Sequence, residues 1–199
     1  WRAYHFIEDA YALDEIKDPQ DFYESAVAFG NFQRMLADFP ADTLTETIAG
    51  FHDTKARFAA FEKVVEEDVC GRAAEVQKEI QFVKDRYDVA CVLGDLLEAG
   101  ELPLRVTHND TKSNNVLMDN ATGKGLCVID LDTVMPGLAV NDFGDSIRFG
   151  ASTGTEDEKD LSKISCDMEL YDIYTKGFVE GCSGALTDME IECLPIGAK

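Results

Sequence analysis

The side chains best suited to chemistry lie together in a short polar run, residues 108–115, which reads His-Asn-Asp-Thr-Lys-Ser-Asn-Asn. Within it, Asp110 could accept a proton from a hydroxyl group, as a general base does. Lys112, two residues further on, could place a cation beside a transferred phosphoryl group. Asn115 offers an amide oxygen, a ligand type that hard cations such as Mg²⁺ accept. A base, a cation and a metal ligand in this order indicate phosphoryl transfer.

A second acidic cluster begins at Asp130, directly after an apolar segment, residues 126–129. Residues 119–125 have the composition of a turn, so we expect a β-hairpin with its two strands on either side of them. Such a hairpin would bring Asn115 and Asp130 to the same end. We therefore predict that these two residues hold Mg²⁺ on the phosphates of ATP while Asp110 faces an acceptor hydroxyl.

Each of these residues also has a purely structural explanation. Asp and Asn are the commonest turn residues, so any one of them taken singly is more often structural than catalytic. The segment Asp130-Leu131-Asp132 could be no more than the exposed end of a strand. The ordered set is more specific: His-x-Asp-x-Lys-x-x-Asn, a hairpin, an Asp after an apolar strand, and then Asp-Phe-Gly-Asp at residues 142–145. That order matches what phosphoryl transfer requires.

The elements that must position this site are helices interspersed with short strands. Hydrophobic periodicity predicts helices over residues 18–39, 53–68, 73–99, 141–148 and 158–180, and strands over residues 1–7, 104–107, 116–118 and 126–129. Turn composition predicts a turn at Pro136-Gly137 and a loop over residues 150–157. Residues 194–199 show no clear closing element. The sequence therefore predicts an α+β fold, mostly helical, with a small β-hairpin that carries the site.

Two segments of the site resemble the catalytic and metal loops of a known enzyme family. The runs THNDTKSNN (residues 107–115) and VIDLD (residues 128–132) are similar to those of the aminoglycoside phosphotransferase/choline kinase-like family, which has the protein-kinase-like two-lobed fold. The wording from residue 104 to residue 149 looks closest to that of N-acetylhexosamine 1-kinases. Those enzymes phosphorylate the anomeric hydroxyl of N-acetylglucosamine and N-acetylgalactosamine.

This resemblance implies a role for each residue of the polar run. Asp110 would be the catalytic base, and Asn115 and Asp130 would be the magnesium ligands that also position ATP. Lys112 would neutralise the transferred phosphate. His108 would brace the loop rather than act on the substrate.

The resemblance extends to the residues that follow the hairpin. Asp142 would be a carboxylate that ties the catalytic loop down from behind. Asp132 would either assist the metal or the substrate, or have no part in the site. Asp145 and Arg148 lie three residues apart on a predicted helix, so we expect them to pair with each other.

By the same resemblance, residues 1–199 would be the C-terminal catalytic lobe of a phosphotransferase, and both ends of the chain look cut. The sequence shows no Gly-rich phosphate loop and no strand with a nucleotide-contacting Lys, features that this family carries in an N-terminal lobe. We therefore expect these 199 residues alone to bind ATP poorly and to turn over little or nothing.

Composition excludes several other classes of function. With 39 acidic and 18 basic residues the formal net charge is −21, which argues against binding to a nucleic-acid backbone or to an anionic membrane. No apolar run approaches the ~20 residues of a membrane span. The six cysteines include no Cys-x-x-Cys pair, so we expect reduced, mostly buried thiols in a cytoplasmic protein.

Three functional readings therefore stand. The favoured one is an ATP- and Mg²⁺-dependent kinase for a sugar, namely an N-acetylhexosamine. The second is a kinase for another small alcohol, such as choline, homoserine or an aminoglycoside, because residues 108–130 serve the phosphate and the metal and say nothing of the acceptor. The third is a non-catalytic pseudokinase lobe. The joint presence of Asp110, Asn115 and Asp130 speaks against the third reading.

Overall fold

The computed structural model describes residues 3–154 and 158–199. The chain divides into two compact units, one formed by Trp1–Thr47 with Leu104–Lys199 and the other by Ile48–Pro103. The predicted site lies entirely in the first unit. Each unit is described by itself below.

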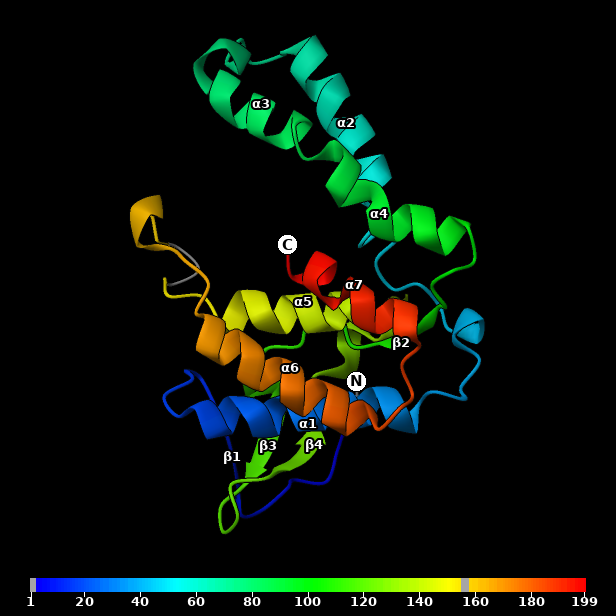
Figure 1. The fold of residues 1–199 in the computed structure, drawn as a ribbon, viewed down its shortest axis with the longest axis vertical. Helices are drawn as coiled ribbons and strands as arrows, with labels where there is room; N and C mark the ends of the chain where they lie inside the picture. Colours follow the sequence, from blue (N-terminus) through cyan, green and yellow to red (C-terminus); the bar gives the residue numbers. More distant parts are fainter. Residues whose placement is uncertain (1–2, 155–157) are drawn as a thin grey trace. The chain divides into compact units, whose positions relative to one another are not determined.

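Long helices form the framework of the first unit. Helix α1 (Pro19–Met35) begins where sequence predicts, because Asp18 accepts a hydrogen bond from the backbone N–H of Gln20 and Pro19 occupies the first turn. It packs along α6 (Met168–Cys182), and the two helices lie side by side in Figure 1. Helix α5 (Ala139–Gly150) packs against α7 (Asp188–Ala198).

Two small antiparallel sheets complete this unit. Strands β1 (Ala10–Ala12), β3 (Val116–Asp119) and β4 (Gly125–Val128) form one sheet in the order β1-β3-β4. Strand β2 (Arg105–Thr107) pairs with β5 (Met135–Gly137) in the other. The predicted hairpin is therefore present as β3 and β4, with Val116 opposite Val128.

The second unit is a set of short helices. Helix α2 (Thr54–Glu67) starts where it is predicted, after Asp53, whose side chain caps it by accepting from the N–H of Ala56. It packs against α4 (Tyr87–Glu98), where the ammonium of Lys55 lies 2.9 Å from a carboxylate oxygen of Glu98. A 3₁₀ turn (Ala73–Val76) and helix α3 (Gln77–Lys84) connect α2 to α4.

The helix predicted over residues 73–99 is wrong as a single element, because the chain breaks between α3 and α4. At the break, the Arg86 guanidinium donates to the carbonyl of Phe82 at 3.0 Å and lies 3.4 Å above the centre of the Phe82 ring. Arg86 thus turns back onto the end of α3 and itself leaves helical geometry, with ψ at 3°. The hydrophobic spacing continues through the break, which is why the pattern conceals it.

Three further predictions are corrected. Residues 3–7 form no strand, and the strand that pairs with the hairpin lies at Ala10–Ala12; residues 1–2 lie outside the described residues. Pro136-Gly137 is part of strand β5, not a turn, because it lies opposite Val106 and Arg105 in the second sheet. The helix predicted over 158–180 begins only at Met168, where Asp167 caps the N–H groups of Glu169 and Leu170. Of the predicted loop 150–157, residues 155–157 lie outside the described residues.

The end of the chain also differs from expectation, since residues 188–198 form helix α7. Thr187 and Glu190 make a reciprocal capping box at its start, and Pro195 lies inside the helix. Glu190 is buried and forms an ion pair with Arg105 of β2 at 2.5 Å. This pair ties α7 to the strand that leads into the predicted catalytic loop.

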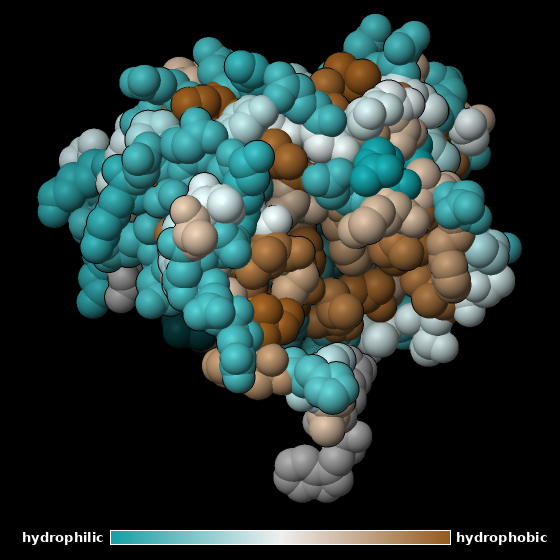
Figure 2. Space-filling model, turned by 90° about the horizontal axis from the view of Figure 1, so that it is seen from below, coloured by the Kyte–Doolittle hydropathy of each residue, from teal (hydrophilic) through white to brown (hydrophobic). Residues whose placement is uncertain are grey.

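Some of the apolar surface of the molecule is exposed. On the face seen from below, apolar side chains gather at the centre and right of the view, and polar ones cover its left and upper parts (Figure 2). The exposed apolar residues include Leu126 on β4 and Leu131, which follows Asp130.

No helix in the described ranges is long and apolar enough to cross a membrane. All cysteines are free; Cys91, Cys182 and Cys193 are buried, whereas Cys70 and Cys166 are exposed, so burial was predicted for more of them than the structure shows.

Candidate active site

In the polar run that follows β2, the backbone N–H groups of residues 108–111 each donate a hydrogen bond to a side chain. Asp142 accepts from the N–H of His108 at 2.9 Å and, through its other oxygen, from that of Asn109 at 2.8 Å. The ring Nδ1 of His108 accepts from the N–H of Asp110 at 3.3 Å, and Asp145 accepts from that of Thr111 at 2.9 Å. The chain can turn here because Asn109 adopts a positive φ of 66°, a conformation that Asn tolerates better than most residues. The loop around Asp110 is therefore fixed at every residue from 108 to 111.

Asp142 is the centre of this arrangement. Its carboxylate is buried and receives a third hydrogen bond, from the amide of Gln33 on α1 at 2.8 Å. Burial raises the pKa of Asp142 to about 6, although the bonds from His108, Asn109 and Gln33 each lower it. The expectation that Asp142 ties the loop down from behind is confirmed by these contacts.

His108 lies wholly inside the protein. Its ring packs edge-on against Phe29 and Phe32, with centroids 5.5 and 5.9 Å away, and its Nε2 lies 2.8 Å from the carbonyl oxygen of Ile129. Because Nδ1 accepts from Asp110, the proton of a neutral ring belongs on Nε2, which then donates to Ile129. His108 thus links the loop to the end of β4 and is too deeply buried to touch a substrate.

The side chains of Asp110, Lys112 and Asn115 contact one another, and Asn115 itself is buried. The Lys112 ammonium lies 3.4 Å from one carboxylate oxygen of Asp110, and the Asn115 amide donates to the other at 3.0 Å. The same amide donates to the backbone carbonyl of Asp110 at 2.8 Å. About a third of each of the Asp110 and Lys112 side chains is exposed, at 30% and 33%. The structure therefore brings these three predicted residues together, and the Asp110 and Lys112 side chains are partly open to a ligand.

The backbone places Asp130 at the same end of the hairpin as Asn115. The N–H of Ile129 donates to the carbonyl of Asn115 at 2.9 Å, so Asp130 is the next residue beyond that bond. Asp130 is exposed and has a left-handed backbone conformation, with φ at 59°. Asp132 lies in the 3₁₀ turn that follows, Leu131–Thr133.

These two residues suit a hard cation by chemistry and by what they leave free. In the described part of the chain, neither the side-chain oxygen of Asn115 nor the carboxylate of Asp130 accepts a hydrogen bond. One amide oxygen and one carboxylate are oxygen donors of the kind that Mg²⁺ binds together with substrate phosphates. Among residues 3–154 and 158–199 there is no group of three His, Cys, Asp or Glu side chains that could hold a metal alone. The pair fits a metal that arrives with its nucleotide.

Several residues that hold the loop were not identified in the sequence. Thr133 donates to the carbonyl of His108 at 2.6 Å, and Asn109 donates to the carbonyl of Thr133 at 2.9 Å. Asp145 pairs with Arg148 at 3.0 Å, as predicted, but its bond to Thr111 was not anticipated. Only the Asp-x-x-Asp spacing in residues 142–145 could have pointed to Asp145, since that spacing places both carboxylates on one face of a helix.

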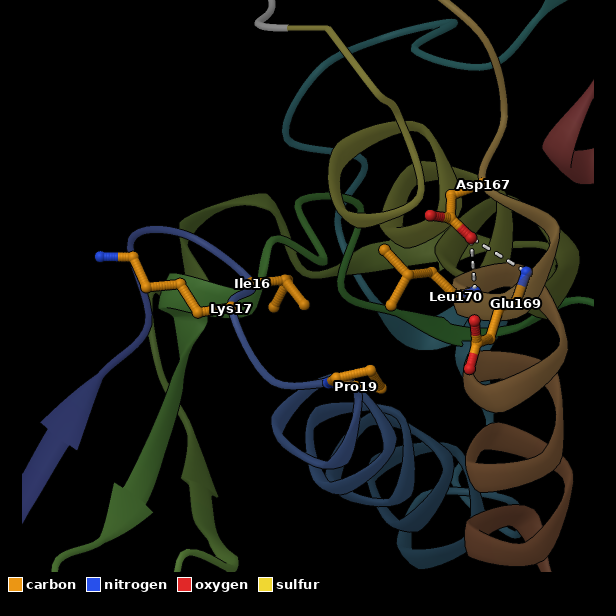
Figure 3. Close-up of a pocket in the computed structure, with 6 residues that line it drawn as sticks. All are labelled: Ile16, Lys17, Pro19, Asp167, Glu169 and Leu170. Atoms are coloured by element: carbon orange, nitrogen blue, oxygen red, sulfur yellow. Dashed lines mark hydrogen bonds between the residues drawn. The ribbon is translucent and has the colours of Figure 1, made fainter.

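A small hollow elsewhere in this unit does not belong to the site. It lies between the segment before α1 and the start of α6, has a volume of about 170 Å³, and is lined by Ile16, Lys17, Pro19, Asp167, Glu169 and Leu170 (Figure 3). The carboxylate of Asp167 is turned to the N–H groups of its own helix, to which it is bonded in Figure 3. None of residues 108–115 lines this hollow.

Two solved structures resemble this chain. An ethanolamine kinase of Plasmodium vivax has a similar structure, with a TM-score of 0.58, 14% sequence identity, and coverage of 96% of this chain and 54% of that one. An aminoglycoside-3'-phosphotransferase of type VIII matches with a TM-score of 0.47 and 17% identity, over 90% of this chain and 61% of that one. The chain thus spans between half and two thirds of the length of these two proteins.

The first of these matches, at its low identity, shows the fold: a mostly helical α+β structure of the kinase-like type, as predicted. A family model adds the relationship. The model of the phosphotransferase enzyme family matches residues 1–166, which contain the loop, the hairpin and the helix behind them. This chain belongs to the phosphotransferase enzyme family.

Proposed function

We propose that the protein containing this chain transfers the γ-phosphoryl group of ATP to a hydroxyl of a small molecule, with Asp110 as the base. One observation carries the proposal: a partly exposed carboxylate, Asp110, lies within 3.4 Å of the Lys112 ammonium and 3.0 Å of the Asn115 amide, on a loop fixed from behind. A base needs access to the reacting hydroxyl and a defined orientation, and the partial exposure of Asp110 and its fixed loop support this role.

The chemistry assigned to the chain is a proton transfer and a charge neutralisation. Asp110 takes the proton of the acceptor hydroxyl while the oxygen of that hydroxyl forms a bond to the γ-phosphorus. The bond from that phosphorus to the β,γ-bridging oxygen breaks, and ADP leaves with the electron pair. Lys112 lies beside Asp110 and would neutralise charge on the transferred group.

Asn115 and Asp130 would hold Mg²⁺, which supplies positive charge to the phosphate oxygens when it is bound. Their free oxygen donors support this assignment, and so does the strongly acidic protein around them, with a net charge of −21. In such a field a polyanionic nucleotide needs a divalent cation to offset repulsion.

For the acceptor we propose the anomeric hydroxyl of an N-acetylhexosamine. Support comes from the wording of residues 104–149, which is similar to that of N-acetylhexosamine 1-kinases. The alternative is another small alcohol. The fold shared with an ethanolamine kinase is equally compatible with that class.

The test uses the full-length gene product. We expect ATP-dependent ADP release with N-acetylglucosamine or N-acetylgalactosamine, and loss of kcat by about 10²- to 10⁴-fold in Asp110→Asn, the usual contribution of a general base. Asp38→Asn, at an exposed carboxylate outside the loop, is the matched control and should keep full activity. Release with choline, ethanolamine, homoserine or an aminoglycoside instead would replace the acceptor and leave the kinase assignment intact.

A pseudokinase lobe predicts a different pattern. Titration of nucleotide binding with Mg²⁺, in wild type and in Asp130→Ala, distinguishes the two. We expect Asp130→Ala to require more Mg²⁺ for the same nucleotide affinity. Nucleotide binding that responds neither to the metal nor to the substitution, with no ADP release from any acceptor, would overturn the kinase proposal.

A further inference from the structure

The peptide group that joins Asp110 to Thr111 is held at both ends. Its carbonyl, that of Asp110, accepts from the side-chain amide of Asn115 at 2.8 Å. Its N–H, that of Thr111, donates to a carboxylate oxygen of Asp145 at 2.9 Å. The orientation of this peptide plane restrains ψ of Asp110, and the backbone conformation at Asp110 limits which rotamers its side chain can adopt.

Thr111 makes two more hydrogen bonds to α5, the helix that carries Asp145. Its hydroxyl donates to the carbonyl of Asp142 at 2.6 Å, and its own carbonyl accepts from the hydroxyl of Ser146 at 2.7 Å. Ser146 in turn accepts from the buried hydroxyl of Tyr174 at 2.6 Å. Because burial raises the pKa of Tyr174, its phenol stays protonated and keeps the Ser146 proton turned toward Thr111.

Asp145 divides its carboxylate between the loop and an outer cation. One oxygen accepts from Thr111, and the other lies 3.0 Å from a guanidinium nitrogen of Arg148. The Asp145 side chain is 20% exposed, against 52% for Arg148. Asp145 therefore faces the loop, with Arg148 on its outer side.

Helix α5, which carries Asp145, is itself closely confined. A Cβ added at Gly144 would lie 1.9 Å from the carbonyl oxygen of Gly197 on α7, so the two helices touch backbone to backbone. Because α5 is held in this way, the Asp145 carboxylate has a fixed position and can hold the N–H of Thr111 in one place.

We propose that Asp145 is a positioning residue for Asp110: through the N–H of Thr111 it sets the peptide plane that aims the Asp110 carboxylate at the acceptor hydroxyl. This inference rests on the proposed role of Asp110 as base. It assigns Asp145 a part in phosphoryl transfer without any contact with substrate.

A double-mutant cycle on the full-length protein tests it. Asp145→Ala should lower kcat by about 10- to 100-fold, the scale expected when a reacting group is misplaced by about 1 Å. Asp145→Asn should stay within about threefold of wild type, because its amide oxygen can still accept from Thr111. Asp172→Ala, an exposed Asp on α6, is the matched control and should leave kcat unchanged.

The decisive comparison is made in the Asp110→Asn background. If Asp145 works by aiming Asp110, Asp145→Ala should cost less than about threefold there, because the group it aims is already removed. Residual turnover can be followed with radiolabelled ATP. A purely structural role predicts the same loss in both backgrounds, and that result would overturn the inference. So would an Asp145→Ala enzyme no slower than Asp172→Ala.

Two further outcomes are separable. If Asp145→Ala does not fold, Asp145→Glu takes its place, since the charge is kept and the carboxylate is displaced by one methylene; the same non-additive loss is expected. If Asp110→Asn itself has normal kcat, the proposed function of Asp110 fails, and the inference falls with it. If Asp110→Asn is impaired but Asp145→Ala and Asp145→Glu both have normal kcat, the inference about Asp145 fails while the proposed role of Asp110 stands.

Discussion

Burial and hydrogen bonding shift the pKa of the Asp142 carboxyl in opposite directions. It is buried, which disfavours its charge, yet it accepts from two loop N–H groups and from Gln33, which favours the charge. Burial is the larger effect, and the pKa rises to about 6. The loop is thus held by a group whose charged state costs free energy near neutral pH.

That balance predicts how stability depends on pH. Between the ordinary pKa of Asp near 3.8 and the folded-state pKa of about 6, the unfolded chain has released this proton while the folded protein still binds it. The contribution of Asp142 is therefore fully present below about pH 4 and is lost as pH rises through about 6. At ~1.4 kcal/mol per pH unit, the loss is on the order of 3 kcal/mol.

The measurement is the free energy of unfolding by urea at pH 4.5 and pH 7, for wild type and for Asp142→Asn. The other carboxyl groups titrate in both proteins, so the difference between the two isolates Asp142. We expect wild type to lose stability relative to Asp142→Asn as pH rises. A difference that is constant, or that grows in favour of wild type, would show that the loop N–H groups keep Asp142 ionised throughout.

Among the elements, the pair α1 and α6 shows how close the backbones come in this unit. A Cβ at Gly181 would lie 2.5 Å from the carbonyl oxygen of Val27 and 3.1 Å from the N of Asn31, and one at Gly30 would lie 2.3 Å from the carbonyl oxygen of Phe178. Helix α1 also supplies Phe29, Phe32 and Gln33, which surround His108 and Asp142. The spacing of α1 and α6 therefore bears on the site.

We predict that Gly181→Ala lowers the free energy of unfolding by about 1–3 kcal/mol, the usual cost of overpacking a tight contact. Gly94→Ala, in the middle of α4, is the control: its Cβ would come no nearer than 3.6 Å to the Lys55 side chain. Alanine there should stabilise by about 0.5–1 kcal/mol through helix propensity. Urea unfolding followed by far-UV circular dichroism measures both, and a Gly181→Ala protein as stable as wild type would contradict the close contact.

At this scale it also becomes clear what sequence could predict. Helices α1 and α2 and the hairpin were predicted because their signals are local: an Asp cap, a periodic apolar face, a turn between two apolar runs. Helix α7 was missed because Pro195 and Gly197 oppose helix locally, while its capping box and its packing on α5 favour it. Strand β5 was missed because Pro-Gly is typical of turns, and only its pairing with β2 makes it a strand.

The same reasoning applies to the site. The polar run shows its chemistry in residue types alone, so Asp110, Lys112 and Asn115 could be chosen from the sequence. The support behind the run could be predicted only in part, since Asp145 contacts Thr111 across 34 positions and Gln33 contacts Asp142 across 109. Bonds between residues so far apart leave no periodic trace in a single sequence.

At the scale of the whole chain, the two units differ in how much they bury. Residues 48–103 are all described, and only Ile80, Cys91 and Leu102 among them are buried. In the other unit, helix α1 alone buries four apolar side chains: Phe22, Ala26, Phe29 and Phe32. Since stability comes chiefly from buried apolar surface, the unit Ile48–Pro103 should be the weaker of the two.

We therefore predict that residues 48–103 open without unfolding the rest. Amide hydrogen exchange should show protection in α2 and α3 at least about tenfold lower than in α1, α5 and α6, which corresponds to about 1.4 kcal/mol less opening free energy. Small additions of urea should leave the fast exchange of α2 and α3 nearly unchanged while they increase exchange in α1, because a local opening exposes less surface than a global one. Mass spectrometry of peptides from each helix resolves the two. Equal protection with the same urea dependence would instead mean that α2 and α3 unfold only together with α1, as parts of one cooperative structure.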